Sequence, residues 1–396
     1  MLYFLTQEYQ SWLDSIGLYR VIQVFTQLEF RAFASVLLAF TYVLLVGPRT
    51  IEWLRRCKVG DNPKFDDAVI DGLSENKRGT PTMGGIVICG AILISTLLLA
   101  DVVHSKYILW TLVTLGWFGG IGLFDDWLKL EASRRPTKSR HGLRTKEKLA
   151  YQCGGAVLIV LALFYTAQGD TNPAAVSLNL PFQRTYELAT RSAFEGALLN
   201  PSVLVLGIFW FTAIGSVWVV GFSNAVNLTD GLDGLAAGTM TVASFVMMVL
   251  CFMSSSREAA SFLMVPHVPG ASELMVVSGA MAGACLGFLW FNCNPARVFM
   301  GDTGSLPLGA LLGFIAVAIR QEVLLLVVGG VFVMEAGSVL MQTSYFKLTK
   351  GKRIFLMTPI HHTFQKHGWT ETQVVTRFWV ICAILGMLAL ASVKMR

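Results

Sequence analysis

The sequence predicts an all-α fold, a polytopic integral membrane protein with about ten transmembrane helices. Of its 396 residues, 54% are apolar and only 14% are charged, whereas a soluble globular chain carries about 25% charged residues. Mean hydropathy is +0.59, and ten bilayer spans of about 20 residues each would use roughly half of the chain. This composition disfavours an ordinary soluble enzyme and excludes a disordered chain.

Ten apolar runs are candidate spans, and we expect one membrane-embedded domain over the whole chain. The runs cover approximately residues 30–48, 83–100, 107–124, 150–167, 202–221, 234–253, 274–291, 305–319, 322–346 and 376–393. Residues 1–27 have the pattern of an amphipathic segment that lies at the membrane surface rather than crossing it. The ninth run contains Glu335 and Gln342, and we expect it to break or tilt near its end.

Basic residues predict which loops face the cytoplasm. The loops that follow odd-numbered spans carry 21 of the 31 Lys and Arg residues, and those that follow even-numbered spans carry five. The odd loops are therefore expected to be cytoplasmic, with both termini periplasmic and residues 168–201 and 254–273 in periplasmic loops. Lys394 and Arg396 oppose this orientation but are outnumbered.

The dense polar clusters all lie in odd-numbered loops or at their borders. They are residues 77–85, 125–129, 224–233, 292–305 and 359–364. Since these loops share one membrane face, we expect a composite active-site cleft on the cytoplasmic side.

Asp125 and Asp126 close the third span, and Lys129 follows them by one helical turn. Adjacent carboxylates repel each other, so a cation is needed to keep both ionised, and Mg²⁺ is the usual partner near phosphate. Alternatively, the pair only caps the end of a span in water.

Two amides and two carboxylates, Asn224, Asn227, Asp230 and Asp233, recur every three residues beside an uncharged span. If the segment is helical, they share one face, and ionisable groups at a membrane border are usually functional. The alternative is a polar loop with turn glycines.

Asp302 lies between Gly301 and Gly304, just ahead of the eighth predicted span. A carboxylate next to flexible backbone suits a metal ligand beside phosphates, although it could be an ordinary turn residue. Asn292 could hydrogen-bond a ligand. Phe299 could either stack on a nucleotide base or simply anchor the chain at the membrane interface.

His361 and His362 occupy the last basic loop, where they could orient phosphate oxygens or transfer protons. A zinc site would need further ligands at suitable spacing, and an inert surface pair is the alternative. The carboxylates alone would repel a polyanionic substrate, and a divalent metal together with Lys77 and Lys129 would reverse the sign of the charge locally. The residues therefore predict Mg²⁺-dependent phosphoryl chemistry at the bilayer edge and no nucleic-acid binding, but they do not identify the substrate.

These motifs closely resemble the polyprenyl-phosphate N-acetylhexosamine-1-phosphate transferase superfamily. The matching pieces, in family order, are residues 77–85 (KRGTPTMGG), Asp125-Asp126-xx-Lys129, residues 224–236, residues 300–305 (MGDTGS) and Pro359-Ile-His361-His362. The GTPTMGG segment and residues 333–342 are similar to the muramoyl-pentapeptide branch rather than the N-acetylglucosamine branch.

The resemblance implies a ten-span, usually dimeric enzyme of the bacterial inner (cytoplasmic) membrane. It would transfer phospho-N-acetylmuramoyl-pentapeptide from UDP to undecaprenyl phosphate with Mg²⁺, giving lipid I and UMP. The implied catalytic residues are Asp125, Asp126, Asp302 and His361, with Mg²⁺ on Asp302 and the Asp pair serving the metal or the lipid phosphate. The implied substrate-binding residues are Asn227, Asp230, Asp233, Asn292 and Phe299 on the nucleotide side, and Lys77, Thr82, Lys129, Gln342, His361 and His362 on phosphates or sugar.

One departure concerns the histidine loop, where the family usually has three histidines followed by Phe-Glu. Here Thr363 takes the third position and Gln365 replaces the acid. Two other functions stay open: an N-acetylglucosamine-1-phosphate transferase of the same superfamily, and a secondary transporter, which would place its carboxylates near the midplane.

Overall fold

The computed structural model describes residues 1–57, 79–134, 142–169, 173–187 and 199–395, and Lys77 lies outside them. Helices dominate. The longer ones are α4 (Leu28–Arg56), α6 (Gly85–Leu99), α7 (Lys106–Arg134), α8 (Thr145–Gly169), α9 (Ile208–Thr229), α10 (Leu235–Ser255), α12 (Leu274–Asn292), α13 (Asp302–Ala318), α15 (Gly330–Leu348) and α17 (Glu371–Val393). The shorter ones are α1 (Leu2–Glu8), α2 (Gln10–Ser15), α3 (Tyr19–Ile22), η1 (Gln23–Thr26), η3 (Pro173–Val176), α11 (Arg257–Leu263), η4 (Pro269–Ala271), α14 (Glu322–Val328) and α16 (Ile360–Lys366).

Each predicted span overlaps a helix. Seven helices of the described chain are long and apolar enough to cross a membrane, or eight if α14 and α15 are counted as one broken span. Helices α6 and α13 are apolar but shorter, at 15 and 17 residues. A mostly helical, multi-pass membrane protein is therefore supported, and ten crossings with periplasmic termini stay a prediction.

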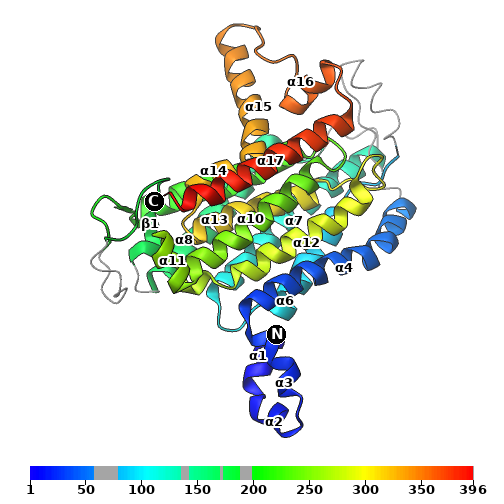
Figure 1. The fold of residues 1–396 in the computed structure, drawn as a ribbon. Helices are drawn as coiled ribbons and strands as arrows, with labels where there is room; N and C mark the ends of the chain where they lie inside the picture. The colour runs from blue at the N-terminus through cyan, green and yellow to red at the C-terminus, as the bar shows by residue number, and fades with distance from the viewer. Residues whose placement is uncertain (58–78, 135–141, 170–172, 188–198, 396) are drawn as a thin grey trace.

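Helix α13 lies at the centre of the bundle. All 17 of its residues are buried, and it packs against α7, α9 and α6. A helix that is apolar all round is covered by protein on every side, so α13 is shielded by its neighbours. Helix α12 packs against α4, α10 and α6, and in Figure 1 α10 lies between α12 and α17. The core helix α13 begins at Asp302, which fixes this predicted site residue relative to the bundle.

The N-terminal segment forms an arm that projects from the bundle (Figure 1). None of its helices is longer than seven residues, so none can span a bilayer. Trp12 and Val21 are 59% and 71% exposed. The predicted position of residues 1–27 at the membrane surface is compatible with this arm and stays a prediction.

The ninth predicted span is bent by 88° between α14 and α15. The expected break near its end is therefore wrong, because the bend lies at Gly329, near the start. A side chain on Gly329 would come within 2.6 Å of the ring of Phe222, so the close packing there requires glycine. Glu335 and Gln342 do not break α15, since both are good helix formers. Each also has a hydrogen-bond partner outside the helix: His361 and the backbone at residues 354–355.

The described part of the predicted loop between α8 and α9 packs against the bundle. It contains the only strands of the described residues, the two-residue pair β1 (Ser177–Leu178) and β2 (Leu204–Val205), a small exception to the all-α prediction. The Arg320 side chain, 1% exposed, donates from Nε to the Ser177 carbonyl over 2.8 Å. This hydrogen bond attaches the segment to the turn between α13 and α14.

Candidate active site

The carboxylate pair lies inside a helix rather than at its end. Asp125 and Asp126 are each 3% exposed, and α7 continues beyond them to Arg134. They therefore do not cap their own helix, so this simple alternative from the sequence does not hold.

Asp126 instead caps the N-terminus of α13, a different helix. Its Oδ2 accepts hydrogen bonds from the Thr303 backbone N–H over 2.9 Å and the Thr303 hydroxyl over 2.7 Å. Its Oδ1 accepts from the Asp302 N–H over 3.3 Å. The first N–H groups of a helix have no partner within it, so Asp126 satisfies them and places α13 next to α7.

Asp302 is the centre of the cluster. Its Oδ1 accepts a hydrogen bond from Asn227 Nδ2 over 2.7 Å, and its Oδ2 lies 3.1 Å from Lys129 Nζ and 2.5 Å from Lys148 Nζ. The side chain is buried at the start of α13, where the helix dipole favours negative charge. Four segments that are distant in the sequence thus meet at one carboxylate.

Two lysines bridge the three carboxylates. Lys129 Nζ lies 2.9 Å from Asp125 Oδ2 and 3.6 Å from Asp126 Oδ1, and Lys148 Nζ lies 3.7 Å from Asp125 Oδ2. Lys148 was not among the predicted site residues. Its position just ahead of the fourth apolar run, in a predicted cytoplasmic loop, was the available signal.

The segment that carries Lys148 is pinned to the carboxylates. Asp125 Oδ1 accepts a hydrogen bond from the Leu143 N–H over 2.7 Å. Gly142 has φ +80°, and a side chain there would lie 2.9 Å from the same oxygen. Glycine therefore lets the backbone turn tightly against Asp125 and bring the next helix to the cluster.

Close helix packing sets the position of the Asp302 backbone. A side chain on Gly122 of α7 would come within 2.2 Å of the Asp302 carbonyl oxygen, and one on Gly85 of α6 within 2.1 Å of the Gly304 nitrogen. The absence of side chains at these positions allows α6 and α7 to approach the first turn of α13.

Asp230 follows α9 and faces the same cluster. Burial raises the pKa of Asp230 well above its usual value, the charge of Asp302 raises it further, and the N–H of Gly301 opposes the increase. Asp230 is therefore electrostatically linked to Asp302 and holds a proton more readily than an exposed carboxylate.

The cluster could hold a divalent metal. Asp125, Asp126 and Asp302 each offer a carboxylate oxygen, and these atoms all lie within 4.8 Å of one another. Oxygen donors of this kind are the ligands that Mg²⁺ prefers. Three ionised carboxylates beside two ammonium groups also leave one negative charge unbalanced, so the residues fit a hard cation.

Other predicted nucleotide-side residues hold loops together. Asn292 Oδ1 accepts from the Gly234 N–H over 3.0 Å and its Nδ2 donates to the Val298 carbonyl over 2.9 Å. Asp233 Oδ2 accepts from the Ala296 N–H over 3.0 Å. The structure thus places Asn292 and Asp233 where the loop after α9 meets the loop after α12.

Phe299 and Thr82 lie where another loop pair meets. The Phe299 N–H donates to the Pro81 carbonyl over 2.8 Å, and its carbonyl accepts from the Gly84 N–H over 2.9 Å. Both the Phe299 and Thr82 side chains are partly exposed. Thr82 Oγ1 would lie 3.0 Å from a side chain on Gly301, next to the cluster.

The predicted phosphate-contacting residues of the last loop are not brought to the carboxylates by any described contact. His361 is fully buried, and its Nδ1 lies 3.0 Å from Oε2 of the equally buried Glu335. His361 Nε2 would lie 2.5 Å from a side chain on Gly231, so the ring packs behind the Asp230–Asp233 loop. Glu335 was noticed in the sequence only as a possible helix breaker.

The remaining residues of this loop bind one another. His362 Nδ1 lies 2.8 Å from Gln365 Oε1, and the Thr363 hydroxyl donates to the Met357 carbonyl over 2.5 Å. Gln342 Oε1 accepts from the Ile354 and Phe355 N–H groups over 2.9 and 3.0 Å. At the position of the usual third histidine, Thr363 therefore stabilises the loop ahead of α16.

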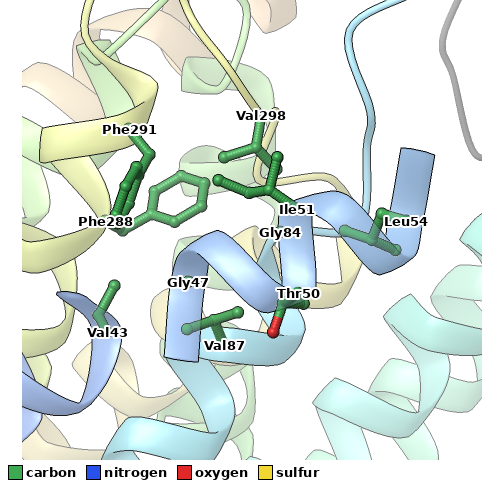
Figure 2. Close-up of a pocket in the computed structure, with 10 residues that line it drawn as sticks. All are labelled: Val43, Gly47, Thr50, Ile51, Leu54, Gly84, Val87, Phe288, Phe291 and Val298. Carbon is green, nitrogen blue, oxygen red and sulfur yellow. The ribbon is translucent and has the colours of Figure 1, made fainter. Parts of the chain in front are cut away.

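A separate, small apolar pocket lies between α4, α6 and α12 (Figure 2). None of the predicted site residues lines it. The lining residues are Val43, Gly47, Thr50, Ile51, Leu54, Gly84, Val87, Phe288, Phe291 and Val298.

Comparison with known proteins identifies the family. The model of glycosyl transferase family 4 matches residues 107–320, and the phospho-N-acetylmuramoyl-pentapeptide-transferase signature 1 matches residues 77–89. A phospho-N-acetylmuramoyl-pentapeptide-transferase from Desulfotalea psychrophila is 43% identical over 374 residues, covering 94% of this chain and 95% of the relative. Another from Desulforapulum autotrophicum is 42% identical over 373 residues with the same coverage. The signature includes the GTPTMGG segment that favoured the muramoyl-pentapeptide branch, and with the near full-length relatives it shows that the chain belongs to the phospho-N-acetylmuramoyl-pentapeptide-transferase family.

Proposed function

We propose that this chain transfers phospho-N-acetylmuramoyl-pentapeptide from UDP-N-acetylmuramoyl-pentapeptide to undecaprenyl phosphate, giving lipid I and UMP. The reaction would take place at the cytoplasmic face of the bacterial inner membrane. The family membership supports the donor and the reaction, and the apolar helices support the membrane location. We further propose that the enzyme works as a homodimer, which light scattering of the purified protein would test.

The cluster of Asp125, Asp126 and Asp302 with two lysines is the observation that carries this proposal. The Nζ atoms of Lys129 and Lys148 both lie within 3.1 Å of Asp302 Oδ2. Each ammonium group has three N–H donors. Ammonium groups bind phosphate oxygens as point charges. The lysines can therefore neutralise the phosphates of donor and acceptor at a site that the carboxylates alone would repel.

The chemical step in this proposal is a direct displacement. An oxygen of the lipid phosphate attacks the β-phosphorus of the donor, a P–O bond forms, and the bond to the UMP oxygen breaks. A phosphate monoester is largely dianionic at neutral pH because its second pKa is about 6, so it needs positioning and charge neutralisation more than a strong base. Lys129 and Lys148 position the phosphates, and Asp125 can accept a residual proton.

Mg²⁺ held by Asp125, Asp126 and Asp302 would supply charge neutralisation for the phosphates when bound. Asn227 holds the Oδ1 atom of Asp302, and Asp126 holds the start of α13, so both fix the orientation of the Asp302 carboxylate.

The decisive experiment measures UMP release by the purified chain with UDP-N-acetylmuramoyl-pentapeptide, undecaprenyl phosphate and Mg²⁺. We expect release with this donor and none with UDP-N-acetylglucosamine, and the opposite preference would assign the chain to the N-acetylglucosamine branch. Asp302→Ala should abolish release while the protein still folds. Unchanged release by Asp302→Ala would refute the assignment of this carboxylate.

A covalent phospho-aspartyl intermediate is the rival mechanism. Incubating the chain with donor labelled in the sugar, without lipid acceptor, distinguishes the two. Direct displacement predicts no label on the protein, and labelled protein would rule out direct displacement.

A further inference from the structure

The outer end of α15 carries an unusual concentration of cations. We call residues 345–356 the α15 tip; they comprise the last turn of α15 and the loop that follows. Lys347, Lys350, Lys352 and Arg353 are all exposed. The sequence has no Asp or Glu between Glu335 and Glu371, and no ion pair joins these four cations to any acidic group in the described part of the chain.

Large apolar side chains alternate with these cations. Leu348 is 82% exposed, Ile354 and Leu356 are each 51% exposed, and Phe346 is 44% exposed. A surface that is both strongly basic and apolar is typical of segments that insert shallowly into an anionic membrane interface. Nucleic acid or an acidic peptide would match the cations but would leave the aliphatic side chains in water.

The α15 tip is folded rather than extended. Gln342 accepts from the Ile354 and Phe355 N–H groups and donates to the Phe355 carbonyl over 3.3 Å, which closes the loop back onto α15. The Gly351 N–H donates to the Phe346 carbonyl over 3.0 Å. The exposed cations and apolar side chains are therefore held close together in one folded segment.

The position of α15 leaves this surface uncovered by the helix bundle. After the 88° bend, α15 leaves the bundle and projects away from it, so that its far end stands clear of the other helices (Figure 1). Leu340 and Met341, nearer the bundle, are 68% and 53% exposed. Charged groups are costly in hydrocarbon, so the cations of the α15 tip must reach the headgroup level while the apolar side chains remain in the acyl region.

We propose that the α15 tip is a docking surface for anionic phospholipids of the cytoplasmic leaflet. Lys350, Lys352 and Arg353 bind headgroup phosphates, and Leu348 and Ile354 insert beneath them. Each cation near an anionic leaflet strengthens such docking by about fivefold. The proposal depends on the membrane location of the chain and not on the transferase reaction.

The test reports the environment of Leu348 directly. Leu348→Cys is labelled with an environment-sensitive fluorophore in the full chain, after the two exposed cysteines are replaced by Cys153→Ser and Cys293→Ser. The protein is reconstituted in phosphatidylcholine nanodiscs with or without phosphatidylglycerol. We expect a blue shift of the emission that grows with the phosphatidylglycerol content and shrinks with added salt.

Two variants and one ligand control make the outcome decisive. Lys350→Gln/Lys352→Gln/Arg353→Gln should lose the response to phosphatidylglycerol, and Arg49→Gln/Arg55→Gln/Arg56→Gln, which removes three cations of α4, should keep it. Equal emission in both lipid mixtures, or an equal shift in the α15 tip variant, would overturn the proposal. A shift caused by UMP or undecaprenyl phosphate in phosphatidylcholine alone would overturn it too, by assigning the cations to a substrate. The readout needs no turnover, so a failure here is distinct from a failure of the proposed reaction.

Discussion

Lys148 shows how much one side chain can contribute when it is placed by the fold. Its ammonium lies 2.5 Å from Asp302 Oδ2 and 3.7 Å from Asp125 Oδ2. It therefore lowers the negative potential of the carboxylate cluster and offers a cation to an incoming phosphate.

Replacing Lys148 should affect metal and donor in opposite directions. In Lys148→Met the cluster becomes more negative, so we expect a lower Mg²⁺ concentration at half-maximal activity and a KM for the donor about tenfold higher, which corresponds to about 1.4 kcal/mol. Steady-state kinetics over a Mg²⁺ series measures both. The nearby exposed Lys146→Met is the control and should behave like wild type. A higher Mg²⁺ concentration at half-maximal activity in Lys148→Met than in wild type would argue against charge as the cause.

Glu335 and His361 form a buried pair whose loss should be structural. Both side chains are fully buried, and Glu335→Ala leaves the imidazole without its partner at Nδ1. Leaving a buried hydrogen-bonding group without its partner costs about 2 kcal/mol. We expect a clearly lower thermal unfolding midpoint in detergent, and a smaller loss in Glu335→Gln, which keeps an oxygen acceptor. Equal midpoints for Glu335→Ala and wild type would contradict this assignment.

At the scale of elements, the meeting of α7 and α13 controls the site. Asp126 on α7 caps the N-terminus of α13. Because Gly122 has no side chain, the two helices approach so closely that a side chain at this position would lie 2.2 Å from the Asp302 carbonyl oxygen. The approach that makes the cap also brings the carboxylates of Asp125 and Asp302 together.

A methyl group at this contact should therefore inactivate the enzyme without a change of charge. Gly122→Ala forces α13 away from α7, and a displacement of about 1 Å at a reacting site can cost about 100-fold in rate. UMP release measures the loss. Gly120→Ala, two residues earlier on α7 where a side chain would meet open space, should keep activity. Similar activity in both variants would show that this contact does not position Asp302.

At the scale of the whole molecule, the predicted orientation can be tested with a native cysteine. Cys293 is exposed and lies in the loop after α12, which is predicted to be cytoplasmic. In a Cys153→Ser background, a membrane-impermeant maleimide should label Cys293 in inside-out vesicles only. Ser202→Cys in a Cys153→Ser/Cys293→Ser background should be labelled in right-side-out vesicles only, because Ser202 directly follows residues 168–201, which are predicted to be periplasmic. The reverse pattern would invert the topology.

The sequence by itself determined the membrane character, the helical segments and the family. A low charge content and ten apolar runs depend on composition and local order, and each of those runs overlaps a helix. The family follows from motifs at fixed positions, such as residues 77–89 and 300–305. These properties are local, so no contact between distant residues was needed to find them.

Only the tertiary structure decided which of the predicted residues touch one another. Asp302 contacts Lys129, Lys148 and Asn227, which are between 75 and 173 residues away in the sequence. His361, expected at the phosphates, is buried against Glu335. The bend of the ninth run lies at Gly329, which packs against the ring of Phe222, a contact that helix periodicity cannot reveal. Helix propensity and charge patterns act over a few residues, whereas these outcomes depend on which helices approach closely enough to bury a side chain.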